Sequence, residues 1–189
     1  MSTPYLTPIE NPKNPLLRLI FMLSRRQMGK VPTPFSVFGA RMPFAFLSFT
    51  GKISRLDKKL KIAPQTALLV REQVAGTNSC LFCQDISRWY ALRKSLVSVE
   101  RLDALAEYRT SALFTDAERA ALDYASELAA EKSVRPETFE RLTRYYSERE
   151  ICDLVWLVAS EHVYNITNHG LNIGSDGFCE LRPASSVHR

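Results

Sequence analysis

Two cysteines separated by two residues, Cys80 and Cys83, are the residues of this chain whose types and spacing could do chemistry. On a helix this spacing places both side chains on one face, a turn apart, close enough to form a reversible disulfide after modest adjustment. Asn78 and Ser79 are good N-cap residues, so a helix is predicted to start at Cys80. A thiol at a helix N-terminus is acidified, because the unsatisfied N–H groups and the dipole favour the reactive thiolate.

Three other interpretations of the pair have to be weighed. Free cysteine is among the most buried residue types, so both side chains could be structural. A tetrahedral zinc site needs four ligands, whereas Cys152 and Cys179 stand alone and the sequence contains no second CxxC and no HxxxH pair. A thioredoxin fold would use the same motif but needs a βαβ context, which the surrounding helix signals contradict. We therefore expect redox chemistry with no metal and no cofactor.

The length of 189 residues is the scale of one domain, and 46% hydrophobic with 24% charged residues is an ordinary globular composition. The net charge of +5 is dispersed among acidic residues, so no nucleic-acid partner is expected. The N-terminus lacks the layout of a signal peptide, and the apolar run Pro43–Phe49 falls well short of the ~20 residues that a membrane-spanning helix needs. We expect a cytoplasmic protein with no membrane contact, in which cysteines stay reduced or catalytic.

The elements that must position the pair are predicted to be helices throughout. Glycine is scarce, and no stretch shows sustained period-2 alternation, so the fold class is all-α. Gly29 can close the first helix in the left-handed conformation, and the apolar stretch from Phe35 to about Ser54 should form two short helices divided at Pro43. The helix-start signals lie at Asn14-Pro15, Pro43, Pro64, Asn78-Ser79, Ser98, Thr115–Glu118, Pro136 and Ser147–Glu150.

The strongest helix signal runs from about Glu148 to Asn168. Apolar residues recur there at steps of three or four, and His162 and His169 continue the stripe, so both histidines are expected to face the interior. The stripe comprises Ile151, Val155, Val158, His162, Ile166 and His169. The last 15 or so residues have little to bury and are expected to be loose.

The segment Asn78-Ser-Cys-Leu-Phe-Cys83, preceded by an apolar helical stretch, resembles the alkylhydroperoxidase/carboxymuconolactone decarboxylase (AhpD-like) family. The resemblance continues through Phe114–Ala125 and Ser147–Ala159 to Asn172, in the family's order and spacing. It implies a single-domain AhpD-like helical bundle that assembles as a homo-oligomer, a dimer, trimer or hexamer. It divides the chain into an N-terminal helical extension packing on the core (1–60), the AhpD-like core (61–176) and a C-terminal tail (177–189).

The resemblance also implies roles for the two sulfurs. In alkylhydroperoxidases the second cysteine attacks the peroxide and the first resolves the sulfenic acid, which makes Cys83 peroxidatic and Cys80 resolving. Helix position alone favours Cys80 as the nucleophile, because it is nearer the helix start and expected to be more exposed. The two arguments disagree, and we follow the resemblance.

The sequence departs from the family at its proton relay. The family places a histidine four residues after the second cysteine and a glutamate about twelve before the first, where this chain has Ser87 and Leu68. Ser87 can hydrogen-bond the sulfur but cannot act as a base near neutral pH. Glu72 and His162 are candidate substitutes, and His162 is the preferred base of the two, although the sequence favours a hydrogen-bonded core histidine at this position over a base.

Asp85 is not a candidate helper, because a nearby negative charge would raise the thiol pKa, and its side chain is expected to face solvent. The predicted function is a thiol-dependent peroxidase or disulfide oxidoreductase that acts on a small hydroperoxide and is regenerated by a dithiol reductant protein. The alternative is a non-catalytic binding or assembly protein that keeps the fold with a degenerate relay. Lactone decarboxylation also occurs in the family, but the cysteine pair counts against it.

Overall fold

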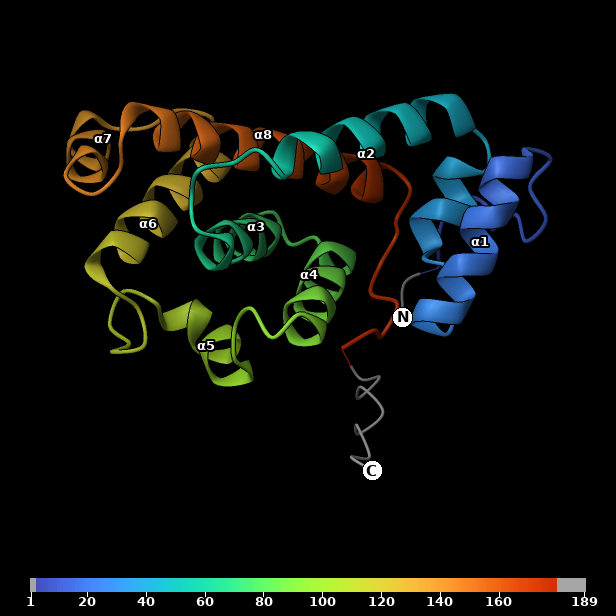
Figure 1. The fold of residues 1–189 in the computed structure, drawn as a ribbon, viewed down its shortest axis with the longest axis horizontal. Helices are drawn as coiled ribbons and strands as arrows, with labels where there is room; N and C mark the ends of the chain where they lie inside the picture. Colours follow the sequence, from blue (N-terminus) through green and yellow to red (C-terminus); the bar gives the residue numbers. More distant parts are fainter. Residues whose placement is uncertain (1–2, 180–189) are drawn as a thin grey trace.

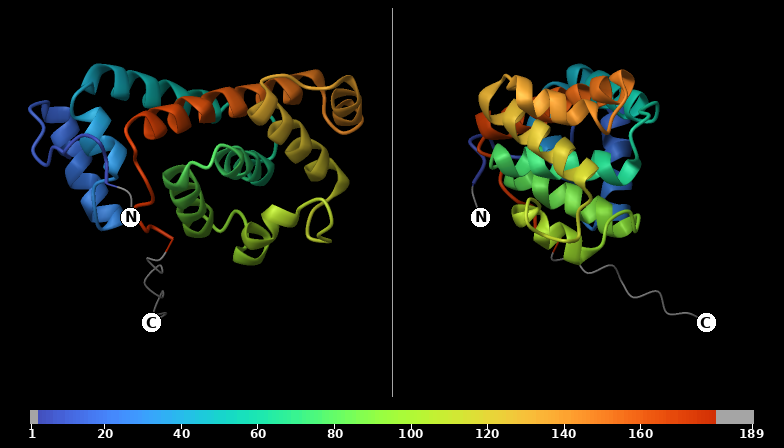
Figure 2. Two further views of the ribbon diagram at one scale, coloured as in Figure 1. Left: turned by 180° about the vertical axis from the view of Figure 1, so that it is seen from behind. Right: turned by 90° about the vertical axis from the view of Figure 1, so that its left-hand side faces the viewer.

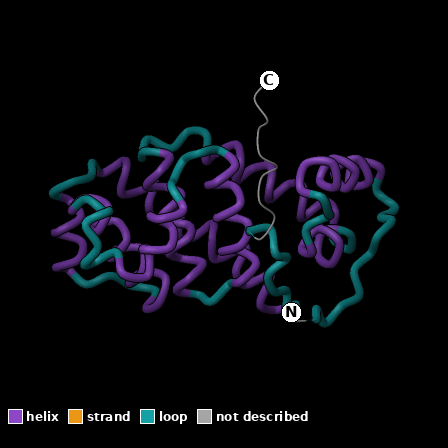
Figure 3. The backbone as a smooth tube through the Cα atoms, turned by 90° about the horizontal axis from the view of Figure 1, so that it is seen from below, coloured by secondary structure: helices purple, strands orange, loops and turns teal. Residues whose placement is uncertain are grey.

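The computed structural model describes residues 3–179, and over this range the chain forms helices joined by loops, with no strand (Figure 3). No helix in these residues is both long and apolar enough to cross a membrane. The all-α prediction is therefore confirmed. In chain order the elements are α1 (Pro15–Met28), the π-helix η1 (Phe35–Gly39), α2 (Pro43–Asp57), α3 (Pro64–Thr77), α4 (Leu81–Arg93), α5 (Val99–Asp103), the 3-10 helix η2 (Ala104–Glu107), α6 (Asp116–Glu131), α7 (Pro136–Thr143) and α8 (Glu148–Gly170).

Four of the predicted N-caps form with the expected side-chain hydrogen bonds, at Asn14, Ser98, Thr115 and Ser147. The predicted caps Asn78 and Ser79 are wrong, because Cys80 is the N-cap of α4 and makes no side-chain capping bond. The Asn14 side chain accepts a hydrogen bond from the Leu17 amide at 3.1 Å, and Gly29 closes α1 with a left-handed φ of 77°. Capping boxes form at the starts of both α6 and α8, where a hydroxyl and a glutamate three residues later satisfy each other's backbone amides. Local chemistry alone thus fixes most helix boundaries.

α3 is the central helix of the molecule. It packs against α4, α6 and α8 (Figure 1), and Leu69, Val70 and Val74 are wholly buried among their side chains. Because α3 is enclosed on several sides, its apolar residues do not follow a single stripe. The chain leaves this helix directly into the segment that carries both cysteines.

The N-terminal part of the chain forms a second, smaller apolar cluster at the end of the molecule opposite α7 (Figure 2). Leu17 and Phe21 of α1 pack with Phe46 of α2, and a Cβ at Gly39 would lie only 3.0 Å from the Phe46 ring, so glycine permits this close approach. From there α2 runs antiparallel along α8, as the Trp156–Asp57 hydrogen bond and the Phe49–Tyr164 ring contact show.

The expectation of a loose C-terminus is wrong for residues 175–179, the last that the structure describes. Phe178 is fully buried between the rings of Phe82 and Trp89. Asp85, expected to face solvent, is itself buried, and its carboxylate accepts hydrogen bonds from four donors in this segment, which lower its pKa against the effect of burial. The donors are the Ser175 hydroxyl and the backbone amides of Asp176, Phe178 and Cys179. The rest of the predicted tail, 180–189, lies outside the described residues.

The predicted inward stripe of α8 is wrong at Val155, which is 43% exposed, and over the C-terminal half of the helix. Ile166 is 67% exposed and His169 is exposed, so both lie on the outer face of the helix. The buried side there carries polar residues instead, Glu161, Asn165 and Asn168. Apolar spacing identified the helix but not the face that it buries.

Candidate active site

The cysteine pair lies where α3 gives way to α4. Ser79 adopts a left-handed φ of 55°, which turns the chain sharply, and Cys80 becomes the N-cap of α4 with Cys83 in its first turn. The two Cα atoms are 5.3 Å apart and the sulfur atoms are joined in a disulfide. The predicted proximity of the two thiols is therefore confirmed.

Cys83 lies on the wall of a cavity of about 450 Å³ between the N-terminal helices and the core. Its volume is typical of small-molecule sites. Both cysteines are buried, Cys80 at 1% and Cys83 at 3% exposure, but of the two only Cys83 contributes to the cavity lining. The expectation that Cys80 is the more exposed thiol is wrong. The aromatic residues of the lining are Phe35, Phe38, Phe46, Phe49, Phe82, Trp89 and Tyr164.

Two asparagine side chains of α8 donate hydrogen bonds to the sulfur of Cys83. The Nδ2 atoms of Asn165 and Asn168 lie 3.0 Å and 3.3 Å from Cys83 Sγ, and Asn168 Nδ2 is also 3.6 Å from Cys80 Sγ. Asn165 is held in turn by Asn78, whose amide donates to its Oδ1 at 2.7 Å. Neutral donors aimed at a buried sulfur stabilise its negatively charged form most, because hydrogen bonds to charged groups are the stronger ones.

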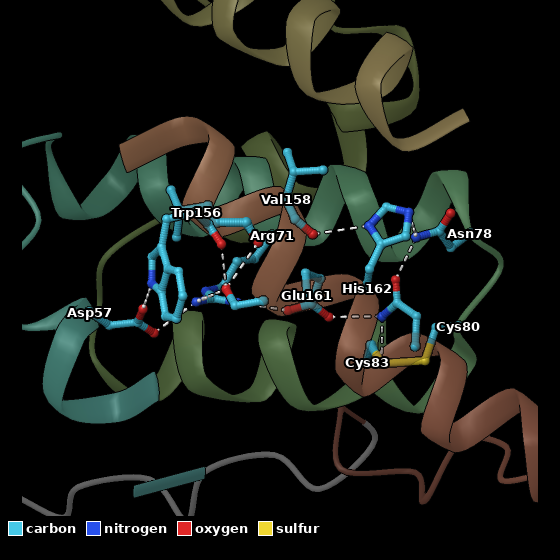
Figure 4. Close-up of polar contacts among 12 residues, drawn as sticks. Asp57, Arg71, Asn78, Cys80, Cys83, Trp156, Val158, Glu161 and His162 are labelled. Atoms are coloured by element: carbon cyan, nitrogen blue, oxygen red, sulfur yellow. Dashed lines mark hydrogen bonds and ion pairs between the residues drawn. A yellow bond between two sulfur atoms is a disulfide. The ribbon is translucent and has the colours of Figure 1, made fainter. Parts of the chain in front are cut away.

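A chain of polar contacts continues from this sulfur along α8 (Figure 4). The second hydrogen bond of Asn165 Nδ2 goes to Glu161 Oε1 at 3.0 Å, while Glu161 Oε2 accepts from Arg71 at 3.0 Å. Arg71 also pairs with Asp57 at 2.7 Å, and Asp57 accepts from the indole of Trp156 at 2.9 Å. The network therefore connects α2, α3 and α8 to the Cys83 sulfur.

The candidates Ser87 and Glu72 occupy different positions. Ser87 lines the cavity together with Cys83. Glu72 is buried, with 5% exposure, and is not among the lining residues. One of its carboxylate oxygens has no hydrogen-bond partner. Burial raises its pKa to about 8, with the negative charges of Glu161 and Asp85 acting in the same direction and Arg88 against it.

His162 is held away from the sulfurs. Its Nδ1 lies 3.0 Å from the carbonyl oxygen of Val158, and its Nε2 lies 3.2 Å from Lys132 Nζ and 3.4 Å from the Asn78 amide. It is connected to Cys83 only through Asn78 and Asn165, and it lies outside the cavity lining. This is the environment of a hydrogen-bonded structural histidine, the second interpretation that the sequence left open.

Sequence reasoning missed three residues that surround the sulfur: Glu161, Asn165 and Asn168. They recur at steps of four and three on a helix that is otherwise rich in apolar residues. That spacing is the signal that was available, because it makes one continuous polar face. Within residues 3–179, no three His, Cys, Asp or Glu side chains are grouped closely enough to hold a metal ion.

A larger hollow of about 1030 Å³ lies along α6 and α7, and its lining contains neither cysteine. Its arginines are neutralised within the hollow itself, since Arg109 and Arg141 pair with Asp123 and Arg135 pairs with Glu127. Of the two hollows, only the smaller, apolar one has a cysteine of the pair in its lining.

Comparison with known proteins gives one curated relative and several similar folds. No family model matches the sequence. The uncharacterized protein YnjA of Escherichia coli (strain K12) is 31% identical over 172 residues, which are 88% of this chain and 91% of YnjA.

Among solved structures, the debrominase Bmp8 has a TM-score of 0.78 at 22% identity and covers 93% of this chain and 94% of its own. A cysteine-to-alanine variant of Bmp8 in complex with 2,3,4-tribromopyrrole matches equally well. The putative antioxidant defence protein AhpD from Agrobacterium tumefaciens has a TM-score of 0.67 at 20% identity, covering 73% of this chain and 94% of that protein. The chain therefore belongs to the family of Escherichia coli YnjA and has the AhpD-like fold that its cysteine segment predicts.

Proposed function

We propose that the protein is a thiol-dependent reductase in which Cys83 attacks a small apolar hydroperoxide and Cys80 resolves the product. The observation that carries the proposal is the position of the Cys83 sulfur, on the wall of an apolar cavity and within bonding distance of a second thiol. The fold that the chain shares with the AhpD protein of Agrobacterium tumefaciens supports a redox role of the pair in general terms.

The reaction balances with these two residues and one substrate. The Cys83 thiolate attacks the terminal oxygen of the hydroperoxide, the O–O bond breaks, and an alkoxide leaves that takes up a proton to become the alcohol. The sulfenic acid on Cys83 then condenses with the Cys80 thiol, which releases water and forms the disulfide. A dithiol partner protein reduces the disulfide for the next turnover.

The cavity supports an uncharged, apolar substrate. Its wall is largely aromatic, and the charged side chains that reach it, Asp57, Arg71 and Glu161, already pair with one another. A charged substrate would lose its hydration there without gaining a free counter-ion. We therefore propose organic hydroperoxides in preference to hydrogen peroxide.

Reductive dehalogenation of a small aromatic compound is a second candidate, because the fold match to the debrominase Bmp8 extends over 93% of this chain, against 73% for the Agrobacterium protein. A match over 93% of this chain has to include most of the N-terminal helices, which contribute part of the aromatic wall. The stoichiometry is similar: two thiols and an aryl halide give the arene, a halide ion, a proton and the disulfide.

The test is substrate consumption by the reduced protein in a single turnover. We expect the wild type and Cys80→Ser to reduce cumene hydroperoxide, with only the wild type ending as a disulfide, and Cys83→Ser to be inactive. Tribromopyrrole in place of the hydroperoxide tests the second candidate, with bromide release as the readout. Thiols that react with neither substrate, although they are accessible to alkylation, would favour the non-catalytic alternative.

Homo-oligomeric assembly and a cytoplasmic location stay predictions.

A further inference from the structure

Reduction of a hydroperoxide at Cys83 needs a group that moves a proton, and the family's histidine position holds Ser87. A hydroxyl does not ionise near neutral pH, and His162 lies outside the cavity with its ring bound to Val158, Lys132 and Asn78. Glu161 is different, because it is a buried carboxyl group that lines the same cavity as Cys83.

The geometry brings the Glu161 carboxylate to the reactive sulfur. A single nitrogen atom, Asn165 Nδ2, donates to both Cys83 Sγ and Glu161 Oε1, at 3.0 Å each. The two acceptors are thus held within two hydrogen-bond lengths of each other (Figure 4). Both residues line the cavity. A substrate oxygen that contacts the sulfur is therefore within reach of the carboxyl group.

The charges around Glu161 come from three helices. Arg71 of α3 donates to its Oε2 and is itself shared with Asp57 of α2, so the positive charge is divided between two carboxylates. Burial raises the pKa of Glu161, while Arg71 and, on α8, Asn165 and His162 act to lower it. Because Arg71 is shared between two carboxylates, burial is the dominant influence on the pKa of Glu161.

Among the remaining ionisable neighbours, Glu72 of α3 favours the protonated form, because Glu72 and Glu161 repel each other when both are charged. On α8, the charge of Glu161 raises the pKa of Tyr164. From α4, Asp85 and Arg88 act on Glu72 with opposite signs. A proton shared between Cys83 and Glu161 thus lies in an environment that penalises a second negative charge.

We propose that Glu161 is the acid–base residue of this site: it accepts the proton of the Cys83 thiol and delivers it to the oxygen that leaves when the O–O bond breaks. The inference rests on the proposed function and names the group that completes it. In the balanced step, the Cys83–oxygen bond forms, the O–O bond breaks, the alkoxide takes the proton from Glu161, and the carboxylate returns to its charged form. Reduction of the disulfide by the dithiol partner restores both protons.

The test compares Glu161→Gln with Glu161→Asp and with the control Glu118→Gln. The control removes another partly buried carboxylate that pairs with an arginine, Arg101 at 2.6 Å, far from the cavity, and glutamine can keep its capping role. We expect single-turnover reduction of cumene hydroperoxide to fall about 100-fold in Glu161→Gln, to recover in part in Glu161→Asp, and to be unchanged in Glu118→Gln.

A second measurement does not depend on peroxide reduction. In the Cys80→Ser background, the rate of Cys83 alkylation by iodoacetamide is followed from pH 5 to 10. A thiol that shares a proton with Glu161 gives a two-step profile, which becomes a single step in Glu161→Gln. The same profile in both proteins would overturn the inference. If the wild type reduces no hydroperoxide but the alkylation profile still has two steps, the proposed function is wrong, while the sharing of a proton between Cys83 and Glu161 stands.

Discussion

Replacement of Asn168 by leucine removes a hydrogen-bond donor from the Cys83 sulfur while keeping the number and branching of the side-chain heavy atoms. Asn168 Nδ2 contacts only the two sulfurs, at 3.3 Å from Cys83 and 3.6 Å from Cys80, and the side chain is 3% exposed. A buried hydrogen bond to a charged group contributes about 1.5–3 kcal/mol. Because Asn165 remains as a second donor, we take the lower end, about 1.5 kcal/mol, which corresponds to roughly tenfold less Cys83 thiolate at neutral pH.

The assay is alkylation of reduced Cys83 in the Cys80→Ser background. We expect Asn168→Leu to slow the reaction about tenfold at pH 7 and to leave it unchanged at high pH, where the thiolate forms regardless. Gln73→Leu is the matched control, because its amide donates to Ser126 at 2.9 Å and touches no sulfur. An unchanged rate at pH 7 in Asn168→Leu would refute the role of the amides in thiolate stabilisation, and an equal loss in Gln73→Leu would show that the effect is not specific.

Three further predictions concern pH, the C-terminal segment and the cavity. The pKa of Glu72 is raised from 4.5 to about 8, so the folded state keeps the proton at higher pH, and stability should fall by up to about 5 kcal/mol as pH rises from about 4.5 to 8. Glu72→Gln should flatten this slope in urea unfolding, and an unchanged slope would contradict the prediction. Asp85→Ala leaves four donors of residues 175–179 without an acceptor and should cost about 3 kcal/mol in urea unfolding at pH 7, whereas a loss below about 1 kcal/mol would contradict the anchoring role. Thr50→Trp should fill the cavity and lower the ratio of cumene hydroperoxide to hydrogen peroxide reduction about tenfold, measured as initial rates; an unchanged ratio would place substrate binding elsewhere.

Helix boundaries could be predicted because their causes are local. The cap at Asn14 and the capping boxes at Thr115 and Ser147 are decided by residues within one turn, and the structure forms all three. The proximity of Cys80 and Cys83 is equally local, since it follows from their spacing at a helix start. These features need no knowledge of how the helices pack.

The surroundings of the sulfur depend on packing and could not be predicted in the same way. The apolar spacing of α8 suggested that Ile166 and His169 face inward, but the helix presents Glu161, Asn165 and Asn168 to the core. A helix with apolar residues on more than one face does not reveal which face is buried. Asp85 shows the same limit, because its four hydrogen-bond donors lie about 90 residues later in the chain.

Because Ser87 stands where the family has a histidine, thiolate stabilisation and proton transfer at Cys83 fall to different residues. An imidazole can both stabilise a thiolate and carry its proton, whereas an amide can do only the first, because it does not ionise near neutral pH. Asn165 and Asn168 therefore lower the energy of the Cys83 thiolate but leave its proton to another group. The cavity wall supplies that group in Glu161, joined to the sulfur through the same Asn165 nitrogen. A site built in this way needs α8 in place before either task can be performed, so the reactivity of Cys83 should depend on tertiary structure more than on its position in α4.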